Sequence, residues 1–293
     1  MKRLVIAIGL LISTTLLWAQ TIKIYSPYSP SHSGTAALLR IVDQANTLQS
    51  VYKFLVEFKP GGNQLIALNA LDQYSVAVIA PAYVDNIANG KIKKEDYIPV
   101  WSLGDACWVG ITNVNLQAVK ELTVGGVGFG NTTHLTALAL GEKYKFDVRY
   151  IVFKSNNDAL INMVGNHGIN FVIDRYEAYA ALKQKNTTLR LVAASCPTRI
   201  PQQPNLPSFK EIGINAPYVF NTVVARKDMP SARRLVIGKI LKEATQQVGK
   251  QTMFDLSAFR PPQFYNIEVE QFHNQSVSTI KKLQLKFGEK IKQ

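Results

Sequence analysis

The sequence predicts an α/β protein of two lobes with mainly parallel sheets. Three observations support this fold class. Residues 20–293, which follow a segment typical of a signal peptide, are enough for two domains of ordinary size. Short β-branched runs alternate with longer helical patterns, as expected of α/β lobes. One pattern of strand, polar loop and helix also occurs twice, roughly 100 residues apart, which is about one lobe. Two lobes suggest a cleft between them.

The N-terminal residues predict export. Lys2 and Arg3 precede the apolar run 4–17, and Ala19 is a small residue suited to cleavage, so residues 1–19 are predicted to be a signal peptide. No later run approaches the roughly 20 apolar residues that a membrane-spanning helix needs. Because no Leu-x-x-Cys lipidation site follows the signal, we expect a free periplasmic protein.

The first half of the chain alternates strands and helices. The run TIKIYS predicts a strand, and the Ala- and Leu-rich run after it predicts a helix. A Pro-Gly-Gly turn then separates a second strand from a second helix. The predicted strands are 21–26, 52–58, 74–81 and at least one within 96–112, and the predicted helices are 34–48 and a segment ending at Leu71.

The second half follows the same order. The predicted strands are ELTVGG at 121–126, then 148–153 and 169–174, and the predicted helices run from about Thr133 to Gly141 and from about Asn157 to Val164. A further helix is expected around Ser231 to Val248, where Pro230 suits a helix start.

Charge favours an anionic ligand. The chain has 33 Lys and Arg against 20 Asp and Glu, a formal net charge of +13. This excess attracts anions at moderate range. The lysines are scattered and no nucleic-acid-binding motif is present, so nucleic acid is not the expected partner.

The cysteines and histidines give no sign of a metal or a cofactor. Neither His-Glu-x-x-His nor Cys-x-x-Cys occurs, so no metal site and no cofactor are predicted. Cys107 and Cys196 could pair in an oxidising compartment. However, Cys107 lies in an apolar stretch and Cys196 precedes a proline, and two buried unpaired thiols are the preferred interpretation.

Two loops carry the predicted chemistry. Each follows a strand and precedes a helix, which is where an open α/β sheet binds its ligands. Unpaired N–H groups and a partial positive charge at a helix N-terminus attract anions, and Ser and Thr hydroxyls add donors. Helix capping by the same side chains is the alternative. The candidates are Ser31, Ser33 and Thr35 in the first loop and Gly128, Asn131, Thr132 and Thr133 in the second.

The second loop also indicates the class of ligand, and three further polar residues have possible roles. The second loop lacks the glycine spacing of nucleotide-binding loops, so a carboxylate suits it better. His134 is expected to be half-exposed and without a catalytic duty. Asp174, which ends a strand, could receive a ligand hydroxyl or ammonium group, or could pair with Arg175 or cap the next helix. A Ser–His hydrolase that uses His32 stays an alternative, although no third member of a triad is visible.

Five segments together resemble a known family. They are VEFKPGGNQLIALNAL (56–71), IKKEDYIPVWSL (92–103), GVGFGNTTHLTALAL (126–140), YIVFKSNNDALINMVGNHGINFVID (150–174) and LRLVAASCPTRIPQQPNLPSFKEIGI (189–214). In order and spacing the chain resembles the extracytoplasmic receptors of tripartite tricarboxylate transporters, the Bug-type substrate-binding proteins. The resemblance covers nearly all of the chain after the signal peptide.

The resemblance implies a type II periplasmic-binding-protein fold, a non-enzymatic receptor and a monomer. It also implies a small mono- or dicarboxylate ligand and, as partners, the membrane permease subunits of a tripartite transporter. A receptor that reports to a sensor kinase would have the same fold. Similar proteins hold one ligand carboxylate between the two loops. By position, that role would fall on Ser31, His32, Ser33, Gly34, Thr35, Gly128, Phe129, Asn131, Thr132 and Thr133, with Ala80 and Pro81 nearby.

The same resemblance gives the domain boundaries and shows two departures. Type II lobes exchange the chain twice, which suggests crossings near Gly110–Thr112 and Asn221–Val224. The first lobe would comprise residues 20–111 and 223–293, and the second lobe residues 112–222. The family's first loop usually has Gly-Gly-x-x-Asp after its proline, whereas here Pro30 is followed by Ser-His-Ser-Gly-Thr. The family's Asp-Gly-Tyr-Thr before the third strand is represented here by LDQYSV, Leu71 to Val76.

Overall fold

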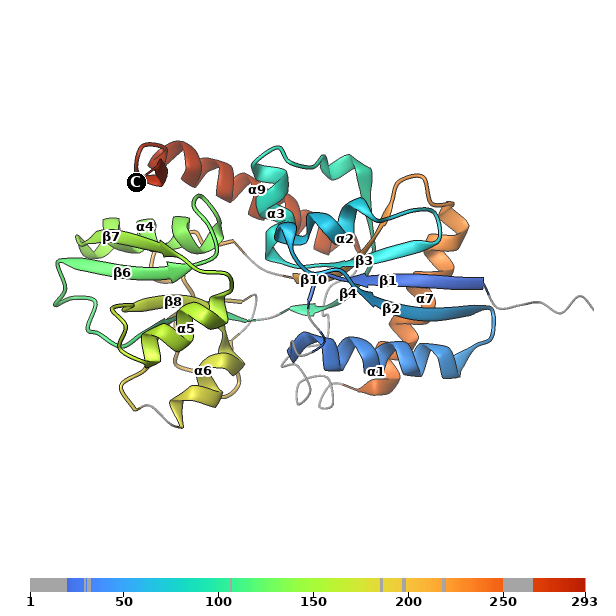
Figure 1. Cartoon of the computed structure of the whole chain (residues 1–293), viewed down its shortest axis with the longest axis horizontal. Coiled ribbons are helices and arrows are strands. Elements are labelled where there is room, and N and C mark those ends of the chain that lie inside the picture. Colours follow the sequence, from blue (N-terminus) through green and yellow to red (C-terminus); the bar gives the residue numbers. More distant parts are fainter. Residues whose placement is uncertain are drawn as a thin grey trace, which may run out of the picture.

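The computed structural model describes residues 20–28, 30, 33–105, 107–184, 187–196, 199–217, 220–249 and 266–292. These residues form two lobes, each built on a five-stranded sheet with helices packed against it (Figure 1). The predicted signal peptide, residues 1–19, lies outside the described residues. Within the described part, no helix combines the length and the apolar character that a membrane span requires.

The first sheet has the strand order β2-β1-β3-β10-β4. The central strand β1 pairs in parallel with both β2 and β3, whereas β10 is antiparallel to its neighbours β3 and β4. The alternating Ile22 and Ile24 of β1 are fully buried, as the sequence pattern requires. The strands are β1 (Gln20–Ser26), β2 (Tyr52–Phe58), β3 (Ser75–Ile79), β4 (Tyr97–Asp105) and β10 (Phe220–Arg226).

The second sheet repeats this arrangement with the order β7-β6-β8-β5-β9. Here β5 is the antiparallel strand, between β8 and β9. Among the described strands, four of the five in each sheet therefore run in one direction, and the prediction of mixed, mainly parallel sheets is confirmed. The strands are β5 (Trp108–Thr112), β6 (Glu121–Gly126), β7 (Asp147–Val152), β8 (Phe171–Arg175) and β9 (Arg190–Ser195).

Helices cover both faces of the first sheet, with α1 and α7 on one face and α2 and α3 on the other (Figure 1). In α1, the buried residues Ala37, Leu38, Ile41, Val42 and Ala45 recur at helical spacing and face the sheet. The helices are α1 (Ser33–Leu48), α2 (Leu65–Asn69), α3 (Pro81–Ala88), α4 (Thr132–Tyr144), α5 (Asn156–Val164), α6 (Tyr176–Lys183), α7 (Ser231–Val248) and α9 (Asn266–Phe287). Short 3-10 turns lie at Gly62–Gln64, Lys94–Asp96 and Lys290–Lys292.

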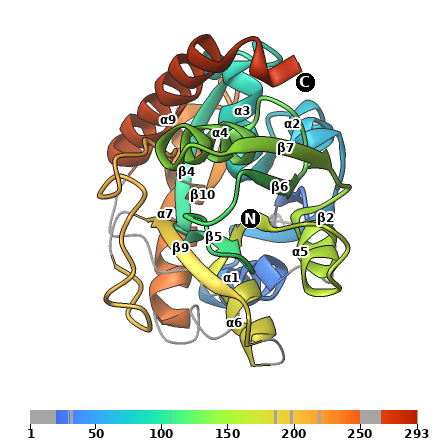
Figure 2. The same ribbon diagram turned by 90° about the vertical axis from the view of Figure 1, so that its left-hand side faces the viewer.

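The long helix α9 joins the two lobes. It packs against α3 and β4 of the first lobe and against α4 of the second, as Figures 1 and 2 show. One apolar cluster is continuous across this junction and includes Tyr83 of α3, Leu135 and Leu138 of α4, and Ile280 and Phe287 of α9. On this side of the molecule the two lobes therefore share a core.

The chain passes from one sheet to the other twice. All of β5 pairs with β8 and β9, and all of β10 pairs with β3 and β4. The crossings therefore lie between residues 105 and 108 and between residues 195 and 220, before the predicted segments Gly110–Thr112 and Asn221–Val224. We propose that the lobe boundaries follow these two crossings.

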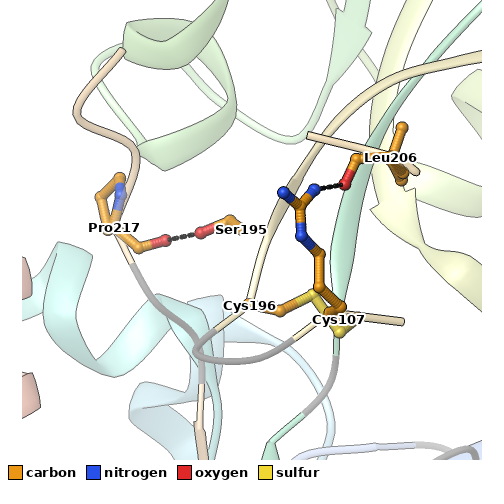
Figure 3. Close-up of a disulfide and its surroundings, with 6 residues drawn as sticks. Cys107, Ser195, Cys196, Leu206 and Pro217 are labelled. Atoms are coloured by element: carbon orange, nitrogen blue, oxygen red, sulfur yellow. Dashed lines mark hydrogen bonds between the residues drawn. A yellow bond between two sulfur atoms is a disulfide. The ribbon is translucent and has the colours of Figure 1, made fainter. Parts of the chain in front are cut away.

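Cys107 and Cys196 form a disulfide, with their Cα atoms 5.0 Å apart (Figure 3). The prediction of two unpaired thiols is wrong for a reason that lies in the sheet. Trp108 at the start of β5 pairs with Ser195 at the end of β9 in an antiparallel ladder. The residue before β5 and the residue after β9 are therefore opposite each other. A pairing between strands so far apart in the sequence gives no local signal.

Candidate functional site at the loop before helix α4

The loop between β6 and α4 (residues 127–131) lies at the side of the second lobe that faces the first (Figure 1). Two glycines let its backbone take this path. Gly130 has φ +68°, which favours glycine. At Gly126 a Cβ would stand 2.0 Å from the Tyr150 hydroxyl, so no larger residue fits without rearrangement.

Several of the loop's N–H groups are bonded within the protein. Gly130 N–H donates to His134 Nδ1 at 3.0 Å, and His134 N–H donates to the Asn131 side chain at 2.9 Å. The Gly128 N–H is directed at the hydroxyl of Tyr150, whose pKa burial raises. Asn131 is thus an N-cap, and the capping alternative accounts for this part of the loop.

Three other N–H groups of this region have no hydrogen-bond partner in the described part of the chain. They belong to Phe129, Asn131 and Thr133. The Thr133 side chain is only 2% exposed, at the start of α4. Backbone donors of this kind at a helix N-terminus are suited to an anion. We therefore take these three residues as the core of the candidate site.

Thr132 is bonded to a residue that sequence analysis did not single out. Its N–H and its hydroxyl donate to Asp85 Oδ1 at 3.1 Å and 2.9 Å. Asp85 belongs to α3 of the first lobe and is buried. Burial raises the pKa of the Asp85 carboxyl to about 6, opposed by the two hydrogen bonds from Thr132. A charged residue within the mostly apolar segment PAYVDNIA was the available signal.

His134 has a structural role. It is 2% exposed, so the expectation of a half-exposed histidine is wrong. Its ring lies 4.3 Å from the ring of Tyr150 and contacts Phe129 at 5.5 Å. Burial lowers the pKa of His134 to about 4, which keeps the ring neutral and its Nδ1 able to accept the Gly130 hydrogen bond at neutral pH.

Phe129 differs from its neighbours because its side chain is half exposed. Its ring packs on His134 and Tyr150, 5.5 Å and 5.6 Å away between centroids, and Phe129 remains 50% exposed. An apolar ring beside unpaired N–H groups is suited to a ligand with both a carboxylate and a carbon chain.

The first predicted loop is described only in part. Ser31 and His32 lie outside the described residues, and of Ser33 only the backbone, as the first residue of α1, is described. Gly34 and Thr35 are buried in the first turn of α1. That turn lies at the side of the first lobe facing the second lobe (Figure 1).

Tyr28, just before this loop, is close to the second crossing. Its hydroxyl donates to the side chain of Asn221 at 2.7 Å. Burial raises the pKa of Tyr28, and the guanidinium of Arg175 from the other lobe acts in the opposite direction. A charge from the second lobe therefore acts on this part of the first lobe.

The other predicted residues, Ala80, Pro81 and Asp174, are at helix starts. Ala80 and Pro81 begin α3, and the Ala80 N–H donates to Gln64 at 3.1 Å. Asp174 is buried, and its carboxylate accepts the N–H of Arg175 at 2.7 Å. Burial raises the pKa of Asp174. The N-cap of α6 is Arg175, and within the described part of the chain no side chain caps this helix, so Asp174 bonds to the residue before the helix and does not cap it.

Surface hollows are present elsewhere, and neither of the two described below is lined by a residue of the predicted site. One, of about 380 Å³, is lined by Leu68, Asn69, Asp96, Tyr97, Arg226, Lys227 and Asp228. A smaller one is lined by Lys210, Asn215, Ala216, Pro217, Gln275, Ser276 and Thr279. Among the described residues, no group of three or more His, Cys, Asp or Glu side chains could hold a metal ion.

Solved structures of known proteins share this fold. A TctC solute-binding protein from Polaromonas superimposes with a TM-score of 0.71 at 21% identity, over 92% of this chain and 99% of its own. MatC from Rhodopseudomonas palustris with bound malate gives 0.68 at 16% identity, over 90% and 98%. A protein from R. palustris with adipate gives 0.69 at 16% identity, over 92% and 97%. The fold is that of the two-lobed periplasmic binding proteins.

Sequence comparison identifies the family. No curated protein sequence matches the chain at a significant level. The profile of the family described as "Tripartite tricarboxylate transporter family receptor" matches residues 111–283, which is more than half of the chain and includes the loop before α4. The chain therefore belongs to the tripartite tricarboxylate transporter family of receptors, which are binding proteins and not enzymes.

Proposed function

We propose that this protein is a periplasmic receptor that captures a small mono- or dicarboxylate for a tripartite transporter. The observation that carries the proposal is the set of N–H groups at Phe129, Asn131 and Thr133, which have no partner among the residues that the structure describes. A carboxylate accepts such bonds without a charged side chain. Relatives of the same fold hold malate and adipate, which are small carboxylates.

The grip on the ligand would come from both lobes. The second lobe would contribute the loop before α4, and the first lobe would contribute the start of α1. Capture by lobe closure requires that the ligand contacts both lobes in the closed form and fewer groups in the open form. The proposed contact residues are Ser31, His32, Ser33, Gly34, Thr35, Ala80, Pro81, Gly128, Phe129, Asn131, Thr132, Thr133 and Asp174.

Location and partners follow from the same proposal. The basic, apolar N-terminal segment 1–19 supports export, and a disulfide is typical of proteins that work outside the cytosol. The receptor would act as a monomer and deliver its ligand to the membrane permease subunits.

Isothermal titration calorimetry against a panel of C3 to C6 mono- and dicarboxylates, including malate and adipate, tests the proposal. The Thr133→Val variant removes a hydroxyl from the first turn of α4, and we expect its affinity for the preferred acid to fall about tenfold or more. Thr136→Val is the matched control, since the Thr136 hydroxyl bonds to Thr132 O one turn further into the helix. Absence of binding by the wild type to every acid of the panel would overturn the proposal, whereas equal affinity in the Thr133 variant would exclude only the hydroxyl of Thr133 from the grip.

A further inference from the structure

Asp85 makes a hydrogen-bonded contact between the lobes. It lies in α3, which packs with strand β3 in the first lobe. Its carboxylate contacts the first residue of α4 in the second lobe. One oxygen, Oδ1, accepts both the N–H and the hydroxyl of Thr132, at 3.1 Å and 2.9 Å. The side chain is 6% exposed, so water contributes little to its solvation.

A buried carboxylate needs compensation. Transfer of a charged group from water to a protein interior is unfavourable unless hydrogen bonds and opposite charge replace the water. Here the compensation comes from the two bonds of Thr132 and from the partial positive charge at the N-terminus of α4. Lys91, just after α3, is the basic side chain that acts on this carboxylate. The arrangement suits an anion that is held at one end of α4.

The position of Asp85 decides which donors of the loop are left for a ligand. The carboxylate takes the first N–H of α4, and Asn131 takes the N–H of His134 two positions later. Thr133, between them, keeps its N–H without a partner in the described part of the chain. The contact therefore uses one N–H of the helix N-terminus and leaves that of Thr133 available for a ligand.

We propose that Asp85 is the positioning residue of the ligand-binding loop: supplied by the first lobe, its carboxylate fixes Thr132 and thereby holds the N–H groups of Phe129, Asn131 and Thr133 in place for the ligand. The role of the loop in binding rests on the proposed function. The contact between the lobes does not, and it can be measured without any ligand.

Amide hydrogen exchange in the ligand-free protein, followed by NMR, is the test. Asp85→Val removes the acceptor, and we expect the Thr132 amide to exchange about tenfold faster or more, with faster exchange also at residues 129–133. Asp85→Asn keeps a side-chain oxygen that can accept the Thr132 N–H. Its exchange rates at these residues should stay within about threefold of the wild type. If asparagine preserves the exchange rates and valine does not, the effect comes from the lost hydrogen bond and not from altered packing.

The control is Thr136→Val, which alters a buried hydroxyl of α4 that does not contact Asp85. It should leave the exchange of the Thr132 amide unchanged. If Asp85→Val does not fold, Asp85→Leu in the same measurement replaces it, and Thr132→Val tests the partner side of the contact. Unchanged exchange at Thr132 in a folded variant without the acceptor overturns the proposal. Faster exchange in that variant, together with no binding of any acid by the wild type, would support the contact between the lobes and reject only the proposed function.

Discussion

Adjacent residues at the N-terminus of α4 have different partners. Thr132 is bonded to the carboxylate of Asp85, whereas the N–H of Thr133 has no partner in the described part of the chain. The unfavourable burial of Asp85 and the open donor of Thr133 are consequences of one local arrangement. At the residue scale, the pH dependence of the free energy of unfolding measures how unfavourable the burial of the Asp85 carboxylate is.

We expect the wild type to lose stability relative to Asp85→Asn as the pH rises. The pKa of the buried Asp85 carboxyl is about 6, above its ordinary 3.8, so between these values the folded protein holds a proton that the unfolded chain releases. The stabilising contribution is complete below about pH 4 and is lost as the pH rises through about 6. Over this interval the difference in unfolding free energy should change by on the order of 2–3 kcal/mol.

Urea titrations of both proteins between pH 4 and 8 measure this difference. The charge of Lys91 lowers the pKa of Asp85, and the charge of Asp85 raises the pKa of Tyr150. Both residues are the same in the two proteins. His134 and His273, whose pKa burial lowers to about 4, reduce stability as the pH falls, and this contribution cancels in the comparison. A difference that stays constant with pH would show that Asp85 keeps an ordinary pKa.

The pairing of strands β5 and β9 places the two cysteines opposite each other. Cys107 precedes β5 directly and Cys196 follows β9 directly, so the disulfide joins one end of this strand pair, close to where the chain enters the second lobe. Ser195 also donates to the carbonyl of Pro217 at 2.5 Å (Figure 3). The segment that returns toward β10 is therefore held beside the end of β9. At the element scale, these contacts join the segments that connect the lobes.

Replacement of both cysteines by serine should lower the free energy of unfolding by roughly 2–5 kcal/mol, because the disulfide closes a loop over a sequence separation of 89 residues. Denaturant titration measures the loss. A reducing agent should destabilise the wild type by a similar amount and leave the double variant unaffected. If reductant destabilised both proteins equally, the effect would not come from this disulfide.

The sequence predicted most elements because each one carries a local pattern. Alternating isoleucines identified β1, and helical spacing of apolar residues identified α1. Helix α3 was not predicted because it follows the five residues of β3 after a single residue, and its first residue, Pro81, was assigned to the end of that strand. The Asp85 contact and the disulfide were missed for a different reason. Both join segments that are far apart in the sequence, and only the packed tertiary structure brings them together.

At the scale of the whole molecule, α9 is part of both lobes. Gln284 donates to the side chain of Asn89 after α3 at 3.0 Å and to the carbonyl of Gly130 in the loop before α4 at 3.1 Å. Lys286 forms an ion pair with Glu142 of α4. A motion that separates the lobes on this side would break these contacts and the shared apolar core. We therefore expect closure to occur mainly on the opposite side.

Gln284→Ala should lower the free energy of unfolding by about 0.5–2 kcal/mol and speed amide exchange at residues 127–131, because two hydrogen bonds are lost. Leu285→Ala is the control, since this side chain is 86% exposed. Its effect should stay within about 0.5 kcal/mol. Equal effects of the two variants on exchange would mean that Gln284 does not hold the loop.

The central claim is that a carboxylate binds to the backbone donors of the loop before α4, between the lobes. The most direct measurement is a crystal structure of the protein with the acid that binds most tightly in the calorimetric panel. We predict that a ligand carboxylate accepts the N–H groups of Phe129, Asn131 and Thr133 and also contacts the start of α1. A ligand bound away from this loop, for example in the hollow lined by Lys210 and Gln275, would contradict the account.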